Sequence, residues 1–319
     1  MNNSLFTIEA ACDDGDFPAV QIWSQVTAPL LSVHRSVLSR FSNSGLSFTL
    51  RLQNQRASRV CVELDTGTIW VSRGTLALLW VCSYLNLVYW ETRCSLGAIG
   101  NRVTIDPHEH HRLFEAMKLL DWGLNHAHAR SGQDQWPDDL PQPRGVDDCP
   151  TSRTATQITL RALGFILLHE MEHVLLRHSG TRQIPSAISI EQEKDADRDA
   201  LADYFEGIDD PNSDEYILHA YGVITAIYEI MLPSFFDGDW GGGTHPPSWQ
   251  RMESLLCQLD LDECHLALVW AAELKSLYLS FPNQSEGGRF ETPADSMNHL
   301  YEICSQGSVG DPLLTVIPL

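Results

Sequence analysis

Residues 169–173 read His-Glu-Met-Glu-His, with two His four positions apart and a Glu directly after the first. Successive residues of an α-helix are about 100° apart, so side chains four positions apart project from nearly the same face. On a helix, His169 and His173 can bind one metal ion, with Glu170 beside it. Two imidazole ligands and an adjacent carboxylate are typical of sites where zinc activates water. The pentapeptide therefore predicts a hydrolytic site with one Zn2+ per chain.

The flanking sequence favours a buried helix around the pentapeptide. Apolar residues recur at helical spacing on one face: Leu160, Leu163, Ile166 and Leu167. With Ser152 or Thr154 as the N-cap and Gly180 as the stop, we predict a helix over about residues 154–178. The alternative is that both His are surface residues, or polar residues with ordinary hydrogen-bond partners.

A zinc site needs a third protein ligand, and its type distinguishes the classes of zinc peptidase. The metzincin pattern requires Gly at position 176 and His at position 179, where this chain has Leu176 and Ser179. His178 is one position early, and on a continuous helix it would point roughly 140° away from His173. The sequence therefore excludes the metzincin pattern.

Residues 191–200 read Glu-Gln-Glu-Lys-Asp-Ala-Asp-Arg-Asp-Ala. Within them, Glu-x-x-Ala-Asp-x-x-Ala resembles the third-ligand motif of the CAAX prenyl endopeptidase and heat-shock membrane protease family, which belongs to the gluzincins. The resemblance implies that Glu193 is the third zinc ligand. It also implies that Asp197 bonds the distal nitrogen of His169 and so fixes the orientation of that ring.

Two alternatives to this assignment stay open from the sequence. Glu191 and Asp195 have the same four-residue spacing as Glu193 and Asp197. Ala196 favours the second pair, because a small residue there lets two helices approach closely. The other alternative is that the segment is only a solvated acidic helix.

A third segment, residues 244–251, reads Thr-His-Pro-Pro-Ser-Trp-Gln-Arg and resembles the segment that follows the third ligand in the same family. The resemblance implies that His245 and Arg251 approach the active site, to bind substrate or stabilise an oxyanion. A structural role in anchoring the loop is an equal alternative. Tyr204 is a second candidate for the oxyanion donor, and the glycines of residues 238–243 are a candidate hinge.

The order of these motifs also resembles that of the soluble Lit-type phage exclusion peptidases, which share an HExxH with a downstream acidic motif. The resemblance to the membrane protease family covers roughly residues 60–260. It leaves the N-terminal 45 residues and the last 60 unassigned. It implies a zincin-like metallopeptidase fold, in which a strand at the sheet edge pairs with an extended substrate.

The pattern of strands and helices predicts an α+β fold with a small N-terminal β-sheet followed by a mainly helical part, with the HExxH helix at its centre. Alternating segments predict strands at residues 47–53, 59–63 and 68–72. Helices are predicted at residues 75–91, 108–130, 154–178, 191–206, 213–232, 247–259, 262–280 and 293–305. We expect a β-containing subdomain at 1–73 and a helical metallopeptidase domain at 74–319.

Two further segments are singled out by composition. Residues 131–152 form an acidic, proline-rich insertion that is either a cover for the active-site cleft or, as we favour, a solvated connecting loop. Residues 106–111 carry three His without an i, i+4 spacing, so the start of a surface helix is favoured over a second metal site.

Composition limits the partners and the location. A net charge of -21 and a pI near 4.8 argue against nucleic acid and anionic membrane surfaces as partners. The longest apolar run, residues 75–90, is shorter than the roughly 20 residues of a spanning helix, so a core helix is expected. The N-terminus lacks signal-peptide features, and the eight scattered Cys indicate mostly buried thiols in a reducing compartment. We therefore expect a cytoplasmic protein.

These features predict a zinc-dependent endopeptidase that hydrolyses peptide bonds in protein substrates, with Glu170 as the base for the water. The resemblance to the Lit-type peptidases narrows this to a dedicated protease of bacterial stress or phage defence, with an activating protein partner. The alternative is a catalytically silent zinc-containing interaction or sensor module. Glu170 argues against that alternative, because a purely structural site does not need this carboxylate. A zinc hydrolase that acts on something other than a peptide is a third, weaker choice.

Overall fold

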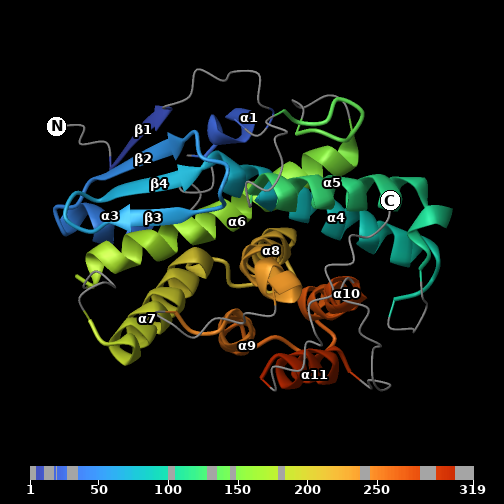
Figure 1. Cartoon of the computed structure of the whole chain (residues 1–319). Coiled ribbons are helices and arrows are strands. Elements are labelled where there is room, and N and C mark those ends of the chain that lie inside the picture. The colour runs from blue at the N-terminus through green and yellow to red at the C-terminus, as the bar shows by residue number, and fades with distance from the viewer. Residues whose placement is uncertain are drawn as a thin grey trace.

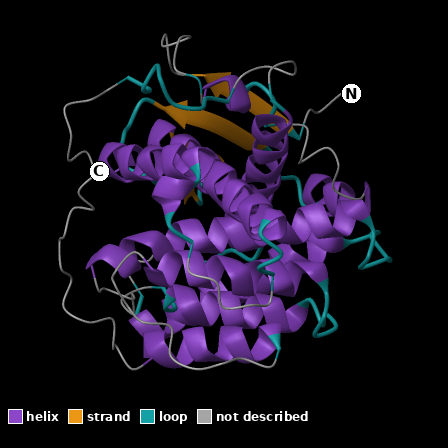
Figure 2. Cartoon of the chain, turned by 90° about the vertical axis from the view of Figure 1, so that its right-hand side faces the viewer, coloured by secondary structure: helices purple, strands orange, loops and turns teal. Residues whose placement is uncertain are grey.

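The computed structural model describes residues 5–10, 18, 20–26, 35–99, 105–127, 135–143, 149–178, 184–237, 245–280 and 292–305. In this part of the chain, a small sheet lies on one side of a larger body of helices (Figure 1, Figure 2). The fold is therefore α+β and mainly helical, with its sheet formed by the N-terminal part of the chain, as the sequence predicts.

The sheet has the strand order β1-β2-β4-β3. Its strands are β1 (Phe6–Ala10), β2 (Phe48–Gln53), β3 (Val60–Glu63) and β4 (Thr68–Ser72). Both β1 and β4 pair with β2 in parallel, whereas β3 pairs with β4 antiparallel. In the described part of the chain β3 is thus an edge strand, and Figure 1 shows it on the side of the sheet nearest the long helix α6.

Among the described residues, the helices follow the sheet in the chain, except for two short ones that precede β2. They are α1 (Val20–Trp23), α3 (Arg35–Asn43), α4 (Arg73–Ser95), the 3-10 helix η1 (Pro107–Glu109), α5 (His111–Ala127), α6 (Pro150–Leu175), α7 (Ser186–Phe205), α8 (Asp214–Asp237), α9 (Ser248–Gln258), α10 (Leu266–Ser280) and α11 (Pro293–Ser305). All eight predicted helices and the three predicted strands are confirmed, with ends that differ by several residues.

In the part of the chain that the structure describes, three elements are present that the sequence did not predict, namely β1, α1 and α3. Strand β1 has only five residues, and its hydrogen bonds come from β2, about forty positions later in the chain. Helices α1 and α3 have four and nine residues. Such short segments depend on tertiary contacts more than on their own periodicity, so the sequence signal is weak.

Helix α6, which carries the HExxH pentapeptide, packs against α4, α7 and α8. It starts earlier than predicted, at Pro150, because proline is tolerated in the first turn, where no intrahelical partner exists for a backbone N–H. It ends at Leu175, and the predicted stop at Gly180 lies outside the described residues. Nearly every position of its middle turns is buried, so the two His are carried on a core helix.

Helix α4 contains the apolar run of residues 75–90, and most of its residues are buried in the core, as predicted. It begins directly after β4, where the Ser72 side chain accepts a hydrogen bond from the Thr75 backbone N–H and caps the helix. In the part of the chain that the structure describes, no helix has both the length and the apolar content that a bilayer crossing requires.

Of the 131–152 insertion the structure describes residues 135–143, and also residues 149–152, which lead into and begin α6. Trp136 is buried against Trp80 and Trp122. The Trp80 indole in turn donates to Thr156, which precedes His169 by about 20 Å of helix. The aromatic anchor of these residues lies on α4 and α5, which favours a connecting loop over a cover for the site, and the role of the insertion stays a prediction.

Buried apolar residues of the sheet and of the helices belong to one hydrophobic cluster, which includes Leu50, Ile69, Leu76 and Leu163. The predicted division into residues 1–73 and 74–319 stays a prediction.

The His-rich segment at residues 106–111 is the start of a surface helix, as favoured, since η1 and α5 begin there and its residues are mostly exposed.

The seven described cysteines are all unpaired. Of these, Cys82 and Cys304 are buried, whereas the other five are exposed or half-buried, and the eighth lies outside the described residues. The expectation of mostly buried thiols is therefore wrong for the described part. A thiol is small enough to be left on the surface at little cost, so cysteine count alone does not predict its burial.

Gly74 lies where the loop that follows β2 crosses the start of α4. Its backbone N–H donates to the Gln55 carbonyl at 3.1 Å, and a Cβ atom at this position would lie 1.6 Å from the Arg56 carbonyl oxygen. The loop leads directly into β3. The absence of a side chain at Gly74 thus allows the close contact that fixes where the edge strand begins.

We predict that Gly74→Ala lowers the free energy of unfolding by about 1–3 kcal/mol, because the added methyl group must displace this loop. The matched control is Gly123→Ala in α5, where the new Cβ would lie 3.4 Å from the Val81 side chain. That variant should be neutral or more stable, since alanine is the better helix former. Urea denaturation measures both, and equal stabilities would contradict the assigned role of Gly74.

Candidate active site

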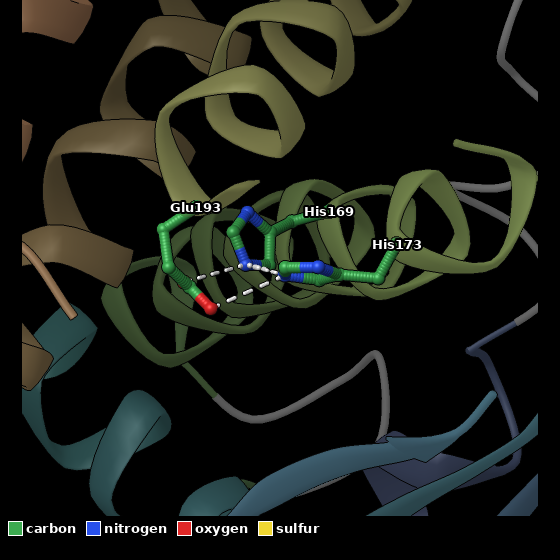
Figure 3. Close-up of side chains that lie close together, drawn as sticks. All are labelled: His169, His173 and Glu193. Atoms are coloured by element: carbon green, nitrogen blue, oxygen red, sulfur yellow. Dashed lines mark hydrogen bonds and ion pairs between the residues drawn. The ribbon is translucent and has the colours of Figure 1, made fainter. Parts of the chain in front are cut away.

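His169 and His173 lie one turn apart on α6, and Glu193 faces them from α7 (Figure 3). The Nε2 atoms of the two His are 3.1 Å apart, and each lies 3.4 Å from a different carboxylate oxygen of Glu193. Ligand atoms around a tetrahedral zinc ion are about 3.3 Å apart. The three side chains therefore fit one zinc ion, and they are the only such cluster found among the described residues.

Asp197, one turn after Glu193 on α7, holds the outer nitrogen of His169. Its Oδ1 lies 2.9 Å from Nδ1 of His169, an ion-pair contact that keeps a proton on this nitrogen and leaves Nε2 to face Glu193. Arg251 on α9 donates two hydrogen bonds to the same carboxylate, at 2.8 and 2.7 Å. Burial would raise the pKa of Asp197, but Arg251 and His169 hold it well below its usual range.

Arg251 is buried, and its guanidinium pairs with both oxygens of the Asp197 carboxylate. Of the two roles expected from the sequence, this contact favours the structural one over binding of substrate or an oxyanion. The physical reason is its bidentate pairing, which uses the planar fork of the guanidinium on one carboxylate.

Burial and neighbouring charges set the protonation states of the three residues of the metal cluster. Burial would lower the pKa of His169, but the Asp197 carboxylate outweighs it and raises the pKa to about 9. Burial and the charge of His169 lower the pKa of His173 to about 3. Burial opposes ionisation of Glu193, yet its hydrogen bond to His169 and the positive charges around it hold the pKa at about 2. In the metal-free protein a proton on His169 thus supplies the positive charge that the cluster requires.

The structure brings Glu193, and not Glu191, to the two His. Glu191 is exposed and pairs with Lys194, and Asp195 pairs with Arg198 on the surface of α7. Ala196, which follows Asp195 directly, is fully buried, and this fits the close approach of α7 to α6. The acidic segment is therefore solvated on one face only.

Glu170 is half-buried next to the edge strand β3. Burial raises the pKa of its carboxyl, against the positive charge of His169, and the backbone N–H of Val62 donates a hydrogen bond to it. A carboxyl with a raised pKa is suited to accept a proton and to release it again near neutral pH.

The backbone of β3 has hydrogen-bonding groups that point away from the sheet. The Arg59 and Glu63 carbonyls accept bonds from Ser72 and Gly67 on the β4 side. Because backbone groups alternate along an antiparallel strand, those of Val60 and Val62 point to the open edge, toward Glu170. The edge that a substrate could pair with thus lies beside the predicted base.

His245 lies at the site, with Nε2 3.4 Å from Glu193 Oε1 and a side chain that is 56% exposed. Thr244 and the candidate hinge at residues 238–243 lie outside the described residues.

Tyr204 is not at the site. It is buried, and its hydroxyl donates to the carbonyl of Arg161, two turns before His169 on α6, which removes it as an oxyanion donor.

His178 is the residue whose position the sequence misjudged most. Helix α6 ends at Leu175, and the chain then turns back, so that Nδ1 of His178 lies 2.8 Å from Nδ1 of His173. The expectation that it points away from His173 assumed a continuous helix and is wrong. No glycine marks this turn in the sequence, so the usual signal of a helix stop is missing.

Comparison with known sequences shows the family of the chain. The sequence pattern of the peptidase U49 family matches residues 69–272, more than half of the chain. The chain belongs to the peptidase U49 family. One relative, the "Cell death peptidase" of Escherichia coli (strain K12), is 23% identical over 259 residues, covering 80% of this chain and 81% of the relative. No solved structure matches. Membership of U49 supports a protease, and the resemblance to the Lit-type peptidases is supported by this relative.

We predict that Glu193→Ala weakens zinc binding by more than about 100-fold, because loss of a direct ligand costs more than loss of an outer contact. Glu191→Ala, on the exposed face of the same helix, is the matched control and should bind zinc like the wild type. Zinc competition titration with a chelating dye measures both affinities. Normal zinc binding by Glu193→Ala would refute the assignment of this ligand.

We also predict that zinc binding at pH 7 releases about one proton. Of the three residues, only His169, with a pKa of about 9, is protonated at that pH in the metal-free protein. Zinc affinity should therefore rise about tenfold per pH unit up to about pH 9 and level off above it. Calorimetry in buffers of different ionisation enthalpy counts the protons, and zero release at pH 7 would contradict the prediction.

Proposed function

We propose that this U49 peptidase is a zinc-dependent endopeptidase of the gluzincin type, with one zinc ion held by His169, His173 and Glu193. The observation that carries the proposal is the convergence of these three ligand atoms at 3.1 to 3.4 Å beside Glu170. When bound, zinc supplies Lewis acidity that lowers the pKa of water and polarises a peptide carbonyl.

Glu170 is the proposed general base. Its carboxylate accepts a proton from the attacking water and then delivers that proton to the leaving amine nitrogen, as hydrolysis of a peptide bond requires. The raised pKa of its carboxyl and its position beside the edge strand β3 support this role.

His245 is the proposed donor to the oxyanion of the tetrahedral intermediate. Its position next to Glu193 and its exposure of 56% support contact with a bound substrate. Asp197 contacts the outer nitrogen of His169, Arg251 contacts Asp197, and neither residue contacts substrate in this mechanism. The contacts from Arg251 to Asp197 and from Asp197 to His169 would keep the lone pair of the ligand nitrogen directed at the metal.

The proposed substrate is an extended segment of a protein that adds to the open edge of β3. Main-chain bonds to Val60 and Val62 would give affinity, while side-chain contacts give selectivity. The acidic net charge of -21 favours basic segments over acidic ones. Because one relative is named a cell death peptidase, we further propose a dedicated cytoplasmic protease of bacterial stress or phage defence, switched on by a protein partner.

The test is a comparison of newly formed protein N-termini in bacterial cells that express the wild type or Glu170→Gln. We predict that the variant retains zinc, because Glu170 is not a ligand, and loses at least about 99% of the cleavage, the order expected for loss of a general base. Purified protein gives the zinc content. Cleavage by Glu170→Gln at the wild-type level would disprove the hydrolytic mechanism, and the same N-termini in cells without the protein would show that the cleavage has another source.

A further inference from the structure

The end of α6 is shaped by a turn that reverses the chain at His178. The His178 backbone N–H donates to the carbonyl of His173 at 3.0 Å, and the Arg177 N–H donates to that of Val174 at 3.1 Å. This pair of bonds defines a Schellman motif, in which the residue after the cap adopts a left-handed conformation. That residue is Arg177, with φ of +55°.

A left-handed conformation costs free energy for any residue with a side chain, and glycine usually occupies this position. Of the described residues, only Arg177 and Asp260 combine a side chain with positive φ. The left-handed conformation of Arg177 turns the chain so that the side chain of His178 reaches His173. Backbone strain of this kind is often retained where it positions a functional group.

The contact between the two imidazoles has a defined direction. In the proposed site His173 directs the lone pair of Nε2 to the metal, so its proton must be on Nδ1. Nδ1 of His178, at 2.8 Å, is then the acceptor, and the proton of that ring is on its own Nε2. The rings meet at 70°, an angle that suits an in-plane hydrogen bond better than stacking.

We propose that His178 is a positioning residue, which accepts the Nδ1 proton of His173 and so fixes the orientation and tautomer of that ligand. The two ligands of α6 are then held by different acceptors. His169 bonds a carboxylate on α7, whereas His173 bonds a neutral imidazole supplied by the end of its own helix. The inference rests on the zinc site of the proposed function and adds a residue outside the pentapeptide to it.

The difference in acceptor has a chemical consequence. A carboxylate increases the electron density of the imidazole that it bonds, and a neutral acceptor does so less. Zinc would therefore be held by two imidazoles of unequal basicity. The outer nitrogen of each ring thus lies close to a polar atom, Asp197 Oδ1 at 2.9 Å for His169 and His178 Nδ1 at 2.8 Å for His173.

The test compares His178→Asn with His178→Leu, two side chains of nearly equal size and shape. The amide oxygen of Asn can take the place of Nδ1 as an acceptor, whereas Leu cannot accept a hydrogen bond. We expect His178→Leu to bind zinc about 10–100 times more weakly than the wild type, and His178→Asn to recover affinity to within about threefold. The zinc-free forms of both should unfold at similar temperatures.

A second variant separates the turn from the side chain. Arg177→Gly keeps the left-handed turn and removes its strain, so it should raise the unfolding temperature without changing zinc affinity. Nitrogen-15 NMR of zinc-loaded protein gives an independent readout. It should show a slowly exchanging Nδ1 proton on His173 in the wild type and in His178→Asn, but not in His178→Leu.

Each outcome bears on one of the two claims. If the wild type binds zinc and His178→Leu binds it equally tightly, the positioning role is wrong while the zinc site stands. If Asn and Leu weaken binding to the same degree, His178 acts through packing and not as an acceptor, which also overturns the inference. If the wild type binds no zinc, the proposed function fails, and the inference fails with it.

Discussion

The structure depends on one electrostatic constraint, the convergence of two imidazole lone pairs and a carboxylate in a mostly buried space between α6 and α7. His169 is 6% exposed and Glu193 is 5% exposed, so water screens their interaction poorly. Lone pairs that face one another at about 3 Å repel unless a cation lies between them. A proton on His169 meets this requirement in the metal-free protein, and we propose that zinc meets it in the active one.

Contacts around this cluster keep the two helices in place. Arg251 of α9 secures Asp197 on one side. On another side, Arg40 of α3 contacts both Glu172 of α6 and Asp203 of α7. Glu172 belongs to the pentapeptide itself, and burial with the nearby Asp203 carboxyl raises its pKa to about 8. A removed guanidinium would leave buried carboxyls facing each other, so each arginine stabilises the helix pair.

Sequence patterns predict the parts of this arrangement that depend on local periodicity. The pentapeptide, the acidic helix with Ala196 and the edge strand all carry signals of spacing or alternation, and each element is present in the structure. The choice between Glu191 and Glu193 could not be made firmly, because both lie one turn from an aspartate. It depends on which face of α7 meets α6, and that is decided by packing.

The missed features share a dependence on long-range or strained contacts. β1 and α3 are short, and their partners lie far away in the chain. His178 was assigned to the wrong direction because Arg177 adopts a conformation that the sequence does not indicate. Tyr204 follows the acidic motif in the sequence, but its hydroxyl donates to a backbone carbonyl within the core. Proximity along a helix is thus weaker evidence than the face on which a residue lies.

Anomalous diffraction at the zinc edge from zinc-loaded crystals would locate the metal directly. We expect one strong peak per chain about 2.0–2.2 Å from Nε2 of His169, Nε2 of His173 and a carboxylate oxygen of Glu193. No peak at this position, or a zinc ion held by other side chains, would contradict this expectation.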